Sequence, residues 1–177
     1  MKILKRILAV SILSAALCLA GCGEKPDKTI DTESYTITVG DEWKEMPMEG
    51  VEDATSLVKN KNESITIVKA PMEPGVEDLT IEEYKELVKQ GFEMQPGIEV
   101  SVLEIQEKEM GEVIYFESKI NMSEIGDYKE GIVVDQIGVY YRNENEVITF
   151  AAQVANGAKT DEAKAELESI LKTIVIK

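Results

Sequence analysis

The chain contains no histidine, and its two cysteines, Cys18 and Cys22, both lie near the N-terminus. Without histidine there is no Ser-His-Asp or Cys-His catalysis. The region after Cys22 can form no internal disulfide and offers neither thiolate nor imidazole ligands for an ordinary zinc, haem or iron–sulfur site. Walker, dinucleotide-binding and EF-hand motifs are also missing from the sequence. We therefore predict that the protein has no catalytic residue, no metal site and no cofactor. We also predict that it is not an enzyme.

Basic residues are the second scarcity. The 177 residues include 19 Lys and Arg against 34 Asp and Glu, a net charge of −15. Lys2, Lys5 and Arg6 precede Cys22, so the chain from Cys22 onward has 16 basic and 34 acidic residues, a net charge of −18. A surface of this sign repels nucleic-acid phosphates and anionic headgroups, and it keeps a protein soluble. We expect no nucleic-acid partner and favour a basic protein of the cell envelope.

The N-terminal residues have the pattern of a secretion signal. A positively charged segment, Met1–Arg6, precedes an apolar run, Ile7–Leu17, which is too short for a transmembrane helix of ~20 residues. Leu19-Ala20-Gly21-Cys22 then resembles the bacterial lipobox at each position. The resemblance implies that Cys22 receives a diacylglyceryl group, with acyl chains of the palmitate type, and that residues 1–21 are removed. Cys18 is a poorer candidate, because the bulky Leu17 precedes it where a small residue is required.

These features divide the chain into three parts. We expect residues 1–21 to be the signal peptide, residues 22–33 the lipidated cysteine with a flexible polar tether, and residues 34–177 a single domain. As a random coil, the tether after Cys22 spans about 18 Å. The predicted location is the extracytoplasmic face of the cell membrane, through the lipid anchor at Cys22.

Alternation of apolar and polar residues predicts several strands, each with one buried and one wet face. The buried positions are expected to be Tyr35, Ile37 and Val39, then Ile65 and Ile67, then Ile114, Phe116, Ile120 and Met122, and finally Ile148, Phe150, Ala152 and Val154. Residues 132–141 are apolar on both parities and predict a central strand, followed by a hairpin turn over Asn143–Glu146. Between Ile98 and Ile105 the apolar positions change phase near Val102, which indicates a bulge or burial on both faces.

Two helices are expected. Thr80 and Glu83 have the spacing of a capping box, and Gly91 has the position of a C-terminal cap. The apolar stripe of this first helix consists of Ile81, Tyr84, Leu87 and Val88. A second helix is predicted from Thr160, with its apolar stripe at Ala163, Leu167, Ile170, Leu171 and Ile174. Strands dominate and hairpins are favoured, so the fold class is α+β.

The order of these elements resembles the Mog1/PsbP-like fold of many small bacterial lipoproteins. The residues that carry the resemblance are Tyr35-Thr36-Ile37 leading to Gly40-Asp41-Glu42-Trp43, Ile65-Thr66-Ile67, the helix entry at Leu79–Tyr84, Tyr140-Tyr141, Ile148-Thr149-Phe150 and Ile170–Ile174. It implies an antiparallel sheet of about six strands with helices packed on its faces. Family members act as accessory proteins or protein-binding adaptors, and the resemblance supplies no catalytic set.

Several short patterns carry chemistry but have simpler explanations. Two Ser-x-x-Lys matches occur, at Ser56–Lys59 and Ser169–Lys172, without the companion motifs of serine acyl-enzymes, so we expect no catalysis by either serine. We expect the remaining candidates to be packing or solvated residues rather than a copper(I) site, a glycosidase pair or a contact surface. They are Met46, Met48 and Met72; the pairs Glu52-Asp53 and Glu82-Glu83; and Trp43 with Tyr140 and Tyr141.

The function predicted from these observations is that of a non-catalytic, membrane-anchored binding or protein-interaction module. The alternatives are a carrier of a hydrophobic ligand such as a lipid, and an enzyme that uses carboxylates alone. An apolar cavity of ~300 Å³ or more would favour the carrier. An exposed apolar or aromatic patch would favour the interaction module.

Overall fold

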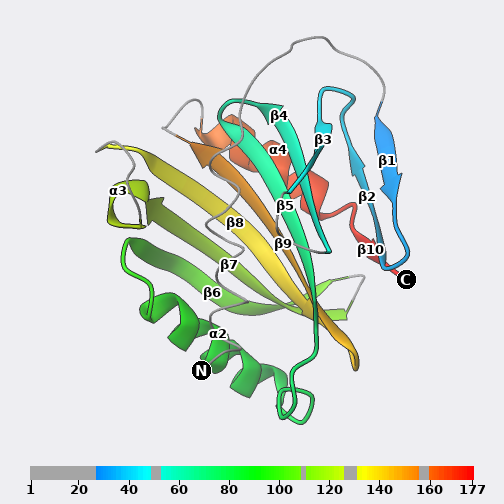
Figure 1. Ribbon diagram of the computed structural model, residues 1–177, viewed down its shortest axis with the longest axis vertical. Coiled ribbons are helices and arrows are strands. Elements are labelled where there is room, and N and C mark those ends of the chain that lie inside the picture. The colour runs from blue at the N-terminus through cyan, green and yellow to red at the C-terminus, as the bar shows by residue number, and fades with distance from the viewer. Residues whose placement is uncertain (1–26, 49–52, 109–110, 126–130, 156–159) are drawn as a thin grey trace.

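The computed structural model describes residues 27–48, 53–108, 111–125, 131–155 and 160–177 (Figure 1). In these ranges the chain forms two antiparallel sheets and three helices, which confirms the α+β class. The larger sheet has the order β3 (Lys44–Pro47), β4 (Ala54–Asn60), β5 (Glu63–Pro71), β9 (Glu146–Ala155), β8 (Val133–Arg142), β7 (Gly111–Asn121) and β6 (Ile98–Lys108). The smaller sheet has the order β1 (Lys28–Asp31), β2 (Tyr35–Val39) and β10 (Val175–Ile176). The helices are α2 (Ile81–Glu93), α3 (Met122–Ile125) and α4 (Thr160–Leu171).

One face of the larger sheet is covered by α4 and by the smaller sheet. Leu167 and Ile170 of α4 and Ile37 of β2 are buried in one apolar cluster with Ile67 and Phe150 of the larger sheet. Both groups lie on the same side because β2 pairs with β10, which follows α4 directly in the chain. The alternating Tyr-Thr-Ile-Thr-Val sequence of β2 thus serves to close the core from outside the main sheet.

The opposite face is covered by α2, which lies beside β6 and β7 (Figure 1). Its buried residues Tyr84, Val88 and Phe92 pack in a second apolar cluster with Phe116 and Tyr140. The Phe92 and Phe116 rings are 5.4 Å apart, and the Phe116 and Tyr140 rings 5.1 Å apart. The sheet therefore separates two cores rather than covering one.

This arrangement corrects the expectation of a wet sheet face for the central strands. In β9, Ile148 and Phe150 are buried on the α4 side, while Val147 and Ala151 are buried on the α2 side. The seven strands of the larger sheet agree with the expected antiparallel sheet of about six, and the smaller sheet is additional. The interpretation of the aromatic residues as core is confirmed: Trp43 and Tyr140 are buried, and Tyr141 packs against the α4-side cluster.

The predicted local irregularities are confirmed. The pairing of β6 with β7 shifts register between Val100 and Val102, which is the predicted bulge. In the turn between β8 and β9, the Asn143 N–H donates to the Glu146 carbonyl at 3.0 Å. The Asn143 side chain accepts from the N–H groups of both Asn145 and Glu146 at 2.9 Å. A side chain that caps its own turn explains why this polar segment separates two apolar strands.

The helix ends match the sequence in part. The capping box is present: the Glu83 N–H donates to Thr80 Oγ1 at 3.2 Å, and the Thr80 N–H donates to the Glu83 carboxylate at 2.8 Å. Gly91, in contrast, is not the C-terminal cap. It lies buried inside the helix, which continues to Glu93 with Met94 as its cap in an ordinary right-handed conformation. A glycine there admits close packing of the helix on the sheet rather than a helix stop. The second helix ends at Leu171.

The N-terminal boundary of the folded region also differs from the expectation. Residues Lys28–Asp31 form β1, paired with β2, so the tether cannot extend to Glu33 as expected. The Lys28 ammonium donates to the Trp43 carbonyl, and Lys177 pairs with Asp31, which fixes both ends of β1. The signal peptide, residues 1–21, and Cys22 lie outside the described residues. No helix in the described ranges is long and apolar enough to cross a membrane.

Candidate functional site

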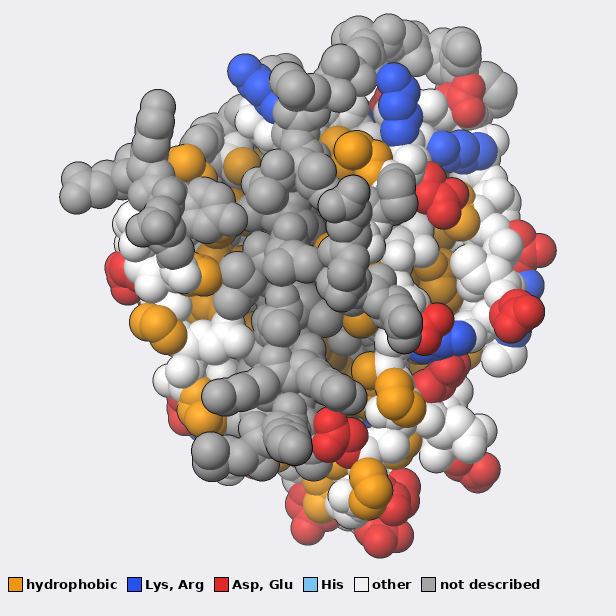
Figure 2. All heavy atoms as spheres, in the orientation of Figure 1, with side chains coloured by type: hydrophobic (Ala, Val, Ile, Leu, Met, Phe, Trp, Pro, Cys, Tyr) orange, Lys and Arg blue, Asp and Glu red, His pale blue; other side chains and the backbone are white. Residues whose placement is uncertain are grey.

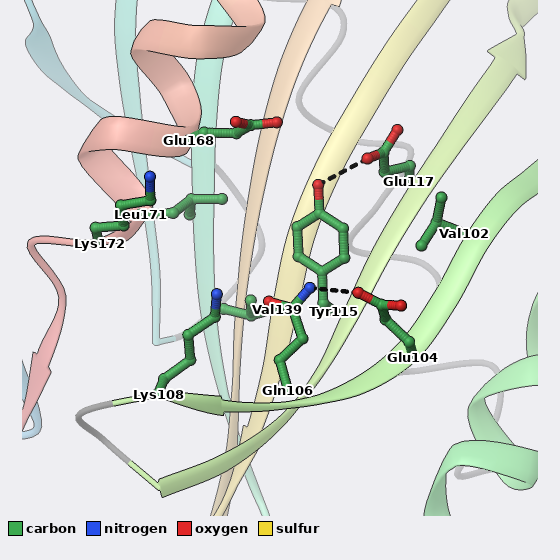
Figure 3. A pocket seen from close by; sticks show the side chains of 10 residues that line it. All are labelled: Val102, Glu104, Gln106, Lys108, Tyr115, Glu117, Val139, Glu168, Leu171 and Lys172. Atoms are coloured by element: carbon green, nitrogen blue, oxygen red, sulfur yellow. Dashed lines mark hydrogen bonds between the residues drawn. The ribbon is translucent and has the colours of Figure 1, made fainter.

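A groove of about 450 Å³ lies between α4 and the β6–β7 hairpin (Figure 3). It exists because α4 packs over β8 and β9 and leaves β6 and β7 open on this side. The bulge in β6 turns that strand, so Val102 and every second residue after it face the groove. The lining residues are Val102, Glu104, Gln106, Lys108, Tyr115, Glu117, Val139, Glu168, Leu171 and Lys172. We call this the α4 groove.

The α4 groove has an apolar floor and a charged rim. Val102, Val139 and Leu171 contribute aliphatic surface, and the ring of Tyr115 lies in the middle of the lining residues (Figure 3). The rim carries three carboxylates and two ammonium groups, which are those of Glu104, Glu117 and Glu168, and of Lys108 and Lys172. Such a combination of apolar surface with a few polar groups is typical of binding sites, and the volume is within the range of ~300–1,000 Å³ for them.

A chain of hydrogen bonds fixes one wall of the α4 groove. The Tyr115 hydroxyl donates to Glu117 Oε1 at 2.9 Å, and Lys164 of α4 donates to Glu117 Oε2 at 2.6 Å. The hydrogen bond from Lys164 holds the pKa of Glu117 below its usual range, although partial burial opposes the shift. Burial, then the hydrogen bond to Glu117 and the negative charges of Glu117, Glu168 and Glu104, raise the pKa of Tyr115 well above its usual range.

These pKa directions suit binding rather than proton transfer. A tyrosine whose pKa is raised keeps its proton at neutral pH, and a glutamate whose pKa is lowered stays ionised. A general acid or base works best when its pKa lies near the operating pH, and both shifts lead away from it. Tyr115 and Glu117 therefore present a fixed hydroxyl and a fixed charge to whatever occupies the groove.

The Lys164–Glu117 ion pair also separates the α4 groove from a second hollow. That hollow has a volume of about 330 Å³ and lies on the other side of the pair. Glu117, which also lines the α4 groove, and Lys164 both line it. Its further charged lining residues are Lys119, Asp135 and Asp161. The two hollows thus follow one flank of α4, with the ion pair between them.

The serine and the lysine of each Ser-x-x-Lys sequence lie in different surroundings. Ser56 is buried in β4, and Lys59, three positions later, faces the opposite side of the strand and pairs with Glu166 at 2.6 Å. Lys59 is therefore not positioned as a base for Ser56. Ser169 is exposed on α4, and Lys172 lies after the helix end on the rim of the α4 groove.

The other candidates from the sequence are also dispersed. Met72 packs against the α2-side cluster, whereas Met46 lies in β3 opposite Ser56. Glu82 is exposed, Glu83 serves the helix cap, and Glu52 lies outside the described residues. Within the described ranges, no group of three or more Asp or Glu side chains is arranged to hold a metal ion.

The residues of the α4 groove were not identifiable as a site from the sequence. Alternation places Tyr115 and Glu117 on one side of β7, but it does not show that α4 stops short of them. Glu168 belongs to α4 and Lys172 follows its last residue, but the sequence shows only the apolar stripe of this helix. The only sequence signal was the phase change at Val102, which predicts that β6 turns at this position.

Comparison with known proteins establishes the fold. No family model matches the chain, and no curated protein sequence matches it. The solution structure of the cyanobacterial PsbP protein, CyanoP, from Synechocystis is similar with a TM-score of 0.61 and 12% identity, over 90% of this chain and 99% of that chain. LpqN, described as involved in cell envelope biogenesis of Mycobacterium tuberculosis, is similar with a TM-score of 0.52 and 11% identity, over 86% of this chain and 91% of that chain. The domain therefore has a PsbP-like fold, as the sequence resemblance predicts.

Proposed function

We propose that this protein is a non-catalytic binding module, anchored by lipid at Cys22 on the extracytoplasmic face of the cell membrane, and that it binds in the α4 groove. The observation that carries the proposal is the groove itself, whose apolar floor and fixed charges lie on the open flank of α4. Its tyrosine and glutamate have pKa values displaced away from neutrality, which supports recognition rather than catalysis.

The location rests on the lipobox, Leu19–Cys22, and on the N-terminal boundary of the fold. Because β1 begins at Lys28, five residues lie between Cys22 and the first strand. A random coil of that length spans about 12 Å, so the domain would be held close to the bilayer. LpqN, which has a similar fold, is described as involved in cell envelope biogenesis.

A carrier of a hydrophobic ligand is the second candidate, and the size of the α4 groove favours it. The volume of about 450 Å³ exceeds what a small apolar ligand requires. The charged rim, in contrast, favours a partner with polar groups. Among the described residues, the exposed large hydrophobic side chains are Met94, Val133 and Val175.

Site-specific crosslinking in the native membrane tests the proposal. A photoreactive amino acid replaces Gln106 or Lys172, which line the α4 groove, or Lys61, which is exposed in the turn between β4 and β5. We expect one and the same adduct from both groove positions and none from Lys61. A lipid adduct would favour the carrier, and a protein adduct the interaction module.

A substitution on the groove floor provides the complementary test. Val102→Glu adds a charge at a half-buried position on the groove floor and changes no residue of the two buried apolar clusters. Val102→Glu should give no adduct from the groove positions. Its unfolding midpoint should equal that of Ser169→Glu, a matched substitution at an exposed position. Equal crosslinking from the groove and from Lys61 would contradict the proposal.

A further inference from the structure

Strand β6 forms a long edge of the larger sheet. Among the described strands, it pairs with β7 alone, so the backbone groups on its other side take part in no sheet ladder. It runs over eleven residues, Ile98–Lys108, whereas the opposite edge strand, β3, has four and ends in Pro47. A long edge strand is a template for a further strand, and proteins usually keep such edges short or covered.

A hollow of about 410 Å³ lies directly along this edge, between β6 and α2. Four successive residues of β6 line it, from Val100 to Leu103. Val100 and Leu103 pack on the α2 side of the sheet, whereas Val102 also lines the α4 groove on the other side, so the hollow lies at the edge of the strand rather than above one face. The edge of β6 at the bulge is therefore open to a ligand. Val102 lines this hollow and the α4 groove alike.

The exposed side chains of β6 determine which strand would fit. They are Glu99, Ser101, Glu104 and Glu107, three acids and no base. A second copy of β6 would place like charges opposite one another, which destabilises cross-strand pairs. Glu99 and Glu104 lie on the α4 side of β6 and Glu107 on the α2 side, so a strand with lysine or arginine at alternate positions would place opposite charges beside Glu99 and Glu104.

We propose that β6 accepts an extended, basic segment of a partner protein as an added strand. This inference rests on the proposed function, since it specifies the partner of a site that includes the α4 groove. Backbone hydrogen bonds to the β6 edge provide affinity, and alternate side chains enter the hollow beside α2 and the α4 groove. The glutamates of β6 select a basic strand and prevent pairing between copies of this chain.

Amide NMR of the isotope-labelled, lipidated mature chain in neutral detergent micelles tests this binding mode. The probe is a short end-blocked peptide of alternating lysine and valine, with a glutamate-for-lysine peptide as control. Two further probes are N-methylated at every second backbone nitrogen, in one phase or in the other. We expect the lysine peptide to shift the amide signals of Ile98–Leu103 and slow their hydrogen exchange. One methylated peptide should bind and the other should not, because a strand pairs through one edge only.

A charge-reversed variant separates this mode from general attraction to an acidic protein. Glu104→Lys/Glu107→Lys changes two exposed residues of β6 and should weaken binding of the lysine peptide by about tenfold. The control Glu77→Lys/Glu144→Lys has the same net charge, changes exposed residues outside β6, and should bind as the unchanged chain does.

The outcomes distinguish the inference from the proposed function. Binding by both methylated peptides, equal weakening by both variants, or no shift in Ile98–Leu103 would each overturn strand addition. The proposed function would still stand if the photoreactive groove positions give their common adduct. Absence of a common adduct from Gln106 and Lys172 in the otherwise unchanged chain would contradict the proposed function whatever the peptides do.

Discussion

At the scale of single residues, Gly138 lies where the sheet leaves no room for a side chain. A Cβ atom on this residue would lie 2.6 Å from the Phe116 ring and closer still to the Phe150 carbonyl. Overpacking costs about 1–3 kcal/mol, and a backbone neighbour cannot move aside, so Gly138→Ala should cost about 3 kcal/mol of unfolding free energy. In the control Gly40→Ala, the new methyl group meets only the Glu42 carboxylate, the far end of a flexible side chain. Urea unfolding midpoints compare the two, and equal losses would show that the sheet relaxes around Gly138.

Lys59 is the residue that joins the β4–β5 hairpin to α4. Its ammonium group lies 2.6 Å from Glu166 and 3.6 Å from both Glu42 and Glu63. Partial burial lowers the pKa of Lys59, but the hydrogen bond from Lys59 to Glu166 and the charges of the three carboxylates outweigh it, so the pKa is raised. Glu166 also accepts the indole N–H of the buried Trp43 at 3.3 Å.

Replacing Lys59 should therefore destabilise the fold in a pH-dependent way. Lys59→Met leaves three carboxylates together and should cost about 1–2 kcal/mol at neutral pH, whereas Lys61→Met in the exposed turn should cost little. A raised pKa in the folded state means that the contribution is complete below the unfolded pKa and disappears as pH rises through the folded one. The unfolding curves of the variant and the unchanged chain should converge at strongly alkaline pH. A constant difference across pH would assign the loss to packing.

At the scale of secondary-structure elements, α2 shows how far periodicity determines a buried face. The predicted stripe was correct for Tyr84 and Val88, but Leu87 is only half buried and Phe92 is almost completely buried. The helix runs past Gly91, which brings Phe92 onto the sheet beside Phe116. Because a helix continues until its tertiary contacts end, the last turn could not be assigned from a glycine alone.

Alanine substitutions in α2 measure this difference directly. Phe92→Ala removes a buried ring and should cost about 3–5 kcal/mol, whereas Leu87→Ala should cost clearly less than the 2–5 kcal/mol of a fully buried leucine. Thr80→Ala should cost on the order of 1 kcal/mol through loss of the cap. Denaturant midpoints of the three variants give the order. A larger loss for Leu87→Ala than for Phe92→Ala would show that the buried face of α2 is rotated from the one described.

The same distinction between local and tertiary information explains what could be predicted of the fold and the site. The turn at Asn143, the cap at Thr80 and the bulge near Val102 depend on neighbouring residues, and the sequence predicts all three. Strand β1, in contrast, has a polar, charged sequence, Lys-Thr-Ile-Asp, and forms because β2 offers it an edge. The α4 groove depends on where α4 crosses the sheet, which no local pattern of Tyr115 or Glu117 encodes.

At the scale of the whole molecule, the first prediction concerns the lipid anchor at Cys22. Cys22→Ala removes the sulfur that the lipobox resemblance assigns to the diacylglyceryl group, so the variant should remain as uncleaved precursor or be released from the membrane. Fractionation of cells after labelling with radioactive fatty acid measures both effects. Cys18→Ala is the matched control and should behave as the unchanged chain does. Label in the Cys22→Ala protein would contradict the lipobox interpretation.

From the acidic character of the molecule we predict how the association rate with a partner depends on salt. The chain from Cys22 onward has a net charge of −18; on the face shown in Figure 2, acidic side chains lie along the right-hand side, with basic side chains among them, and at the lower end. A field of this sign accelerates the encounter with a basic partner, and salt screens it over a Debye length of ~10 Å at 0.1 M. The association rate with the partner captured at the α4 groove should therefore fall as salt is raised, while the dissociation rate changes less. Stopped-flow association at low and at physiological ionic strength measures this. An association rate indifferent to salt would mean that the acidic surface serves solubility alone, and that recognition rests on the groove and on the β6 edge without help from the overall charge.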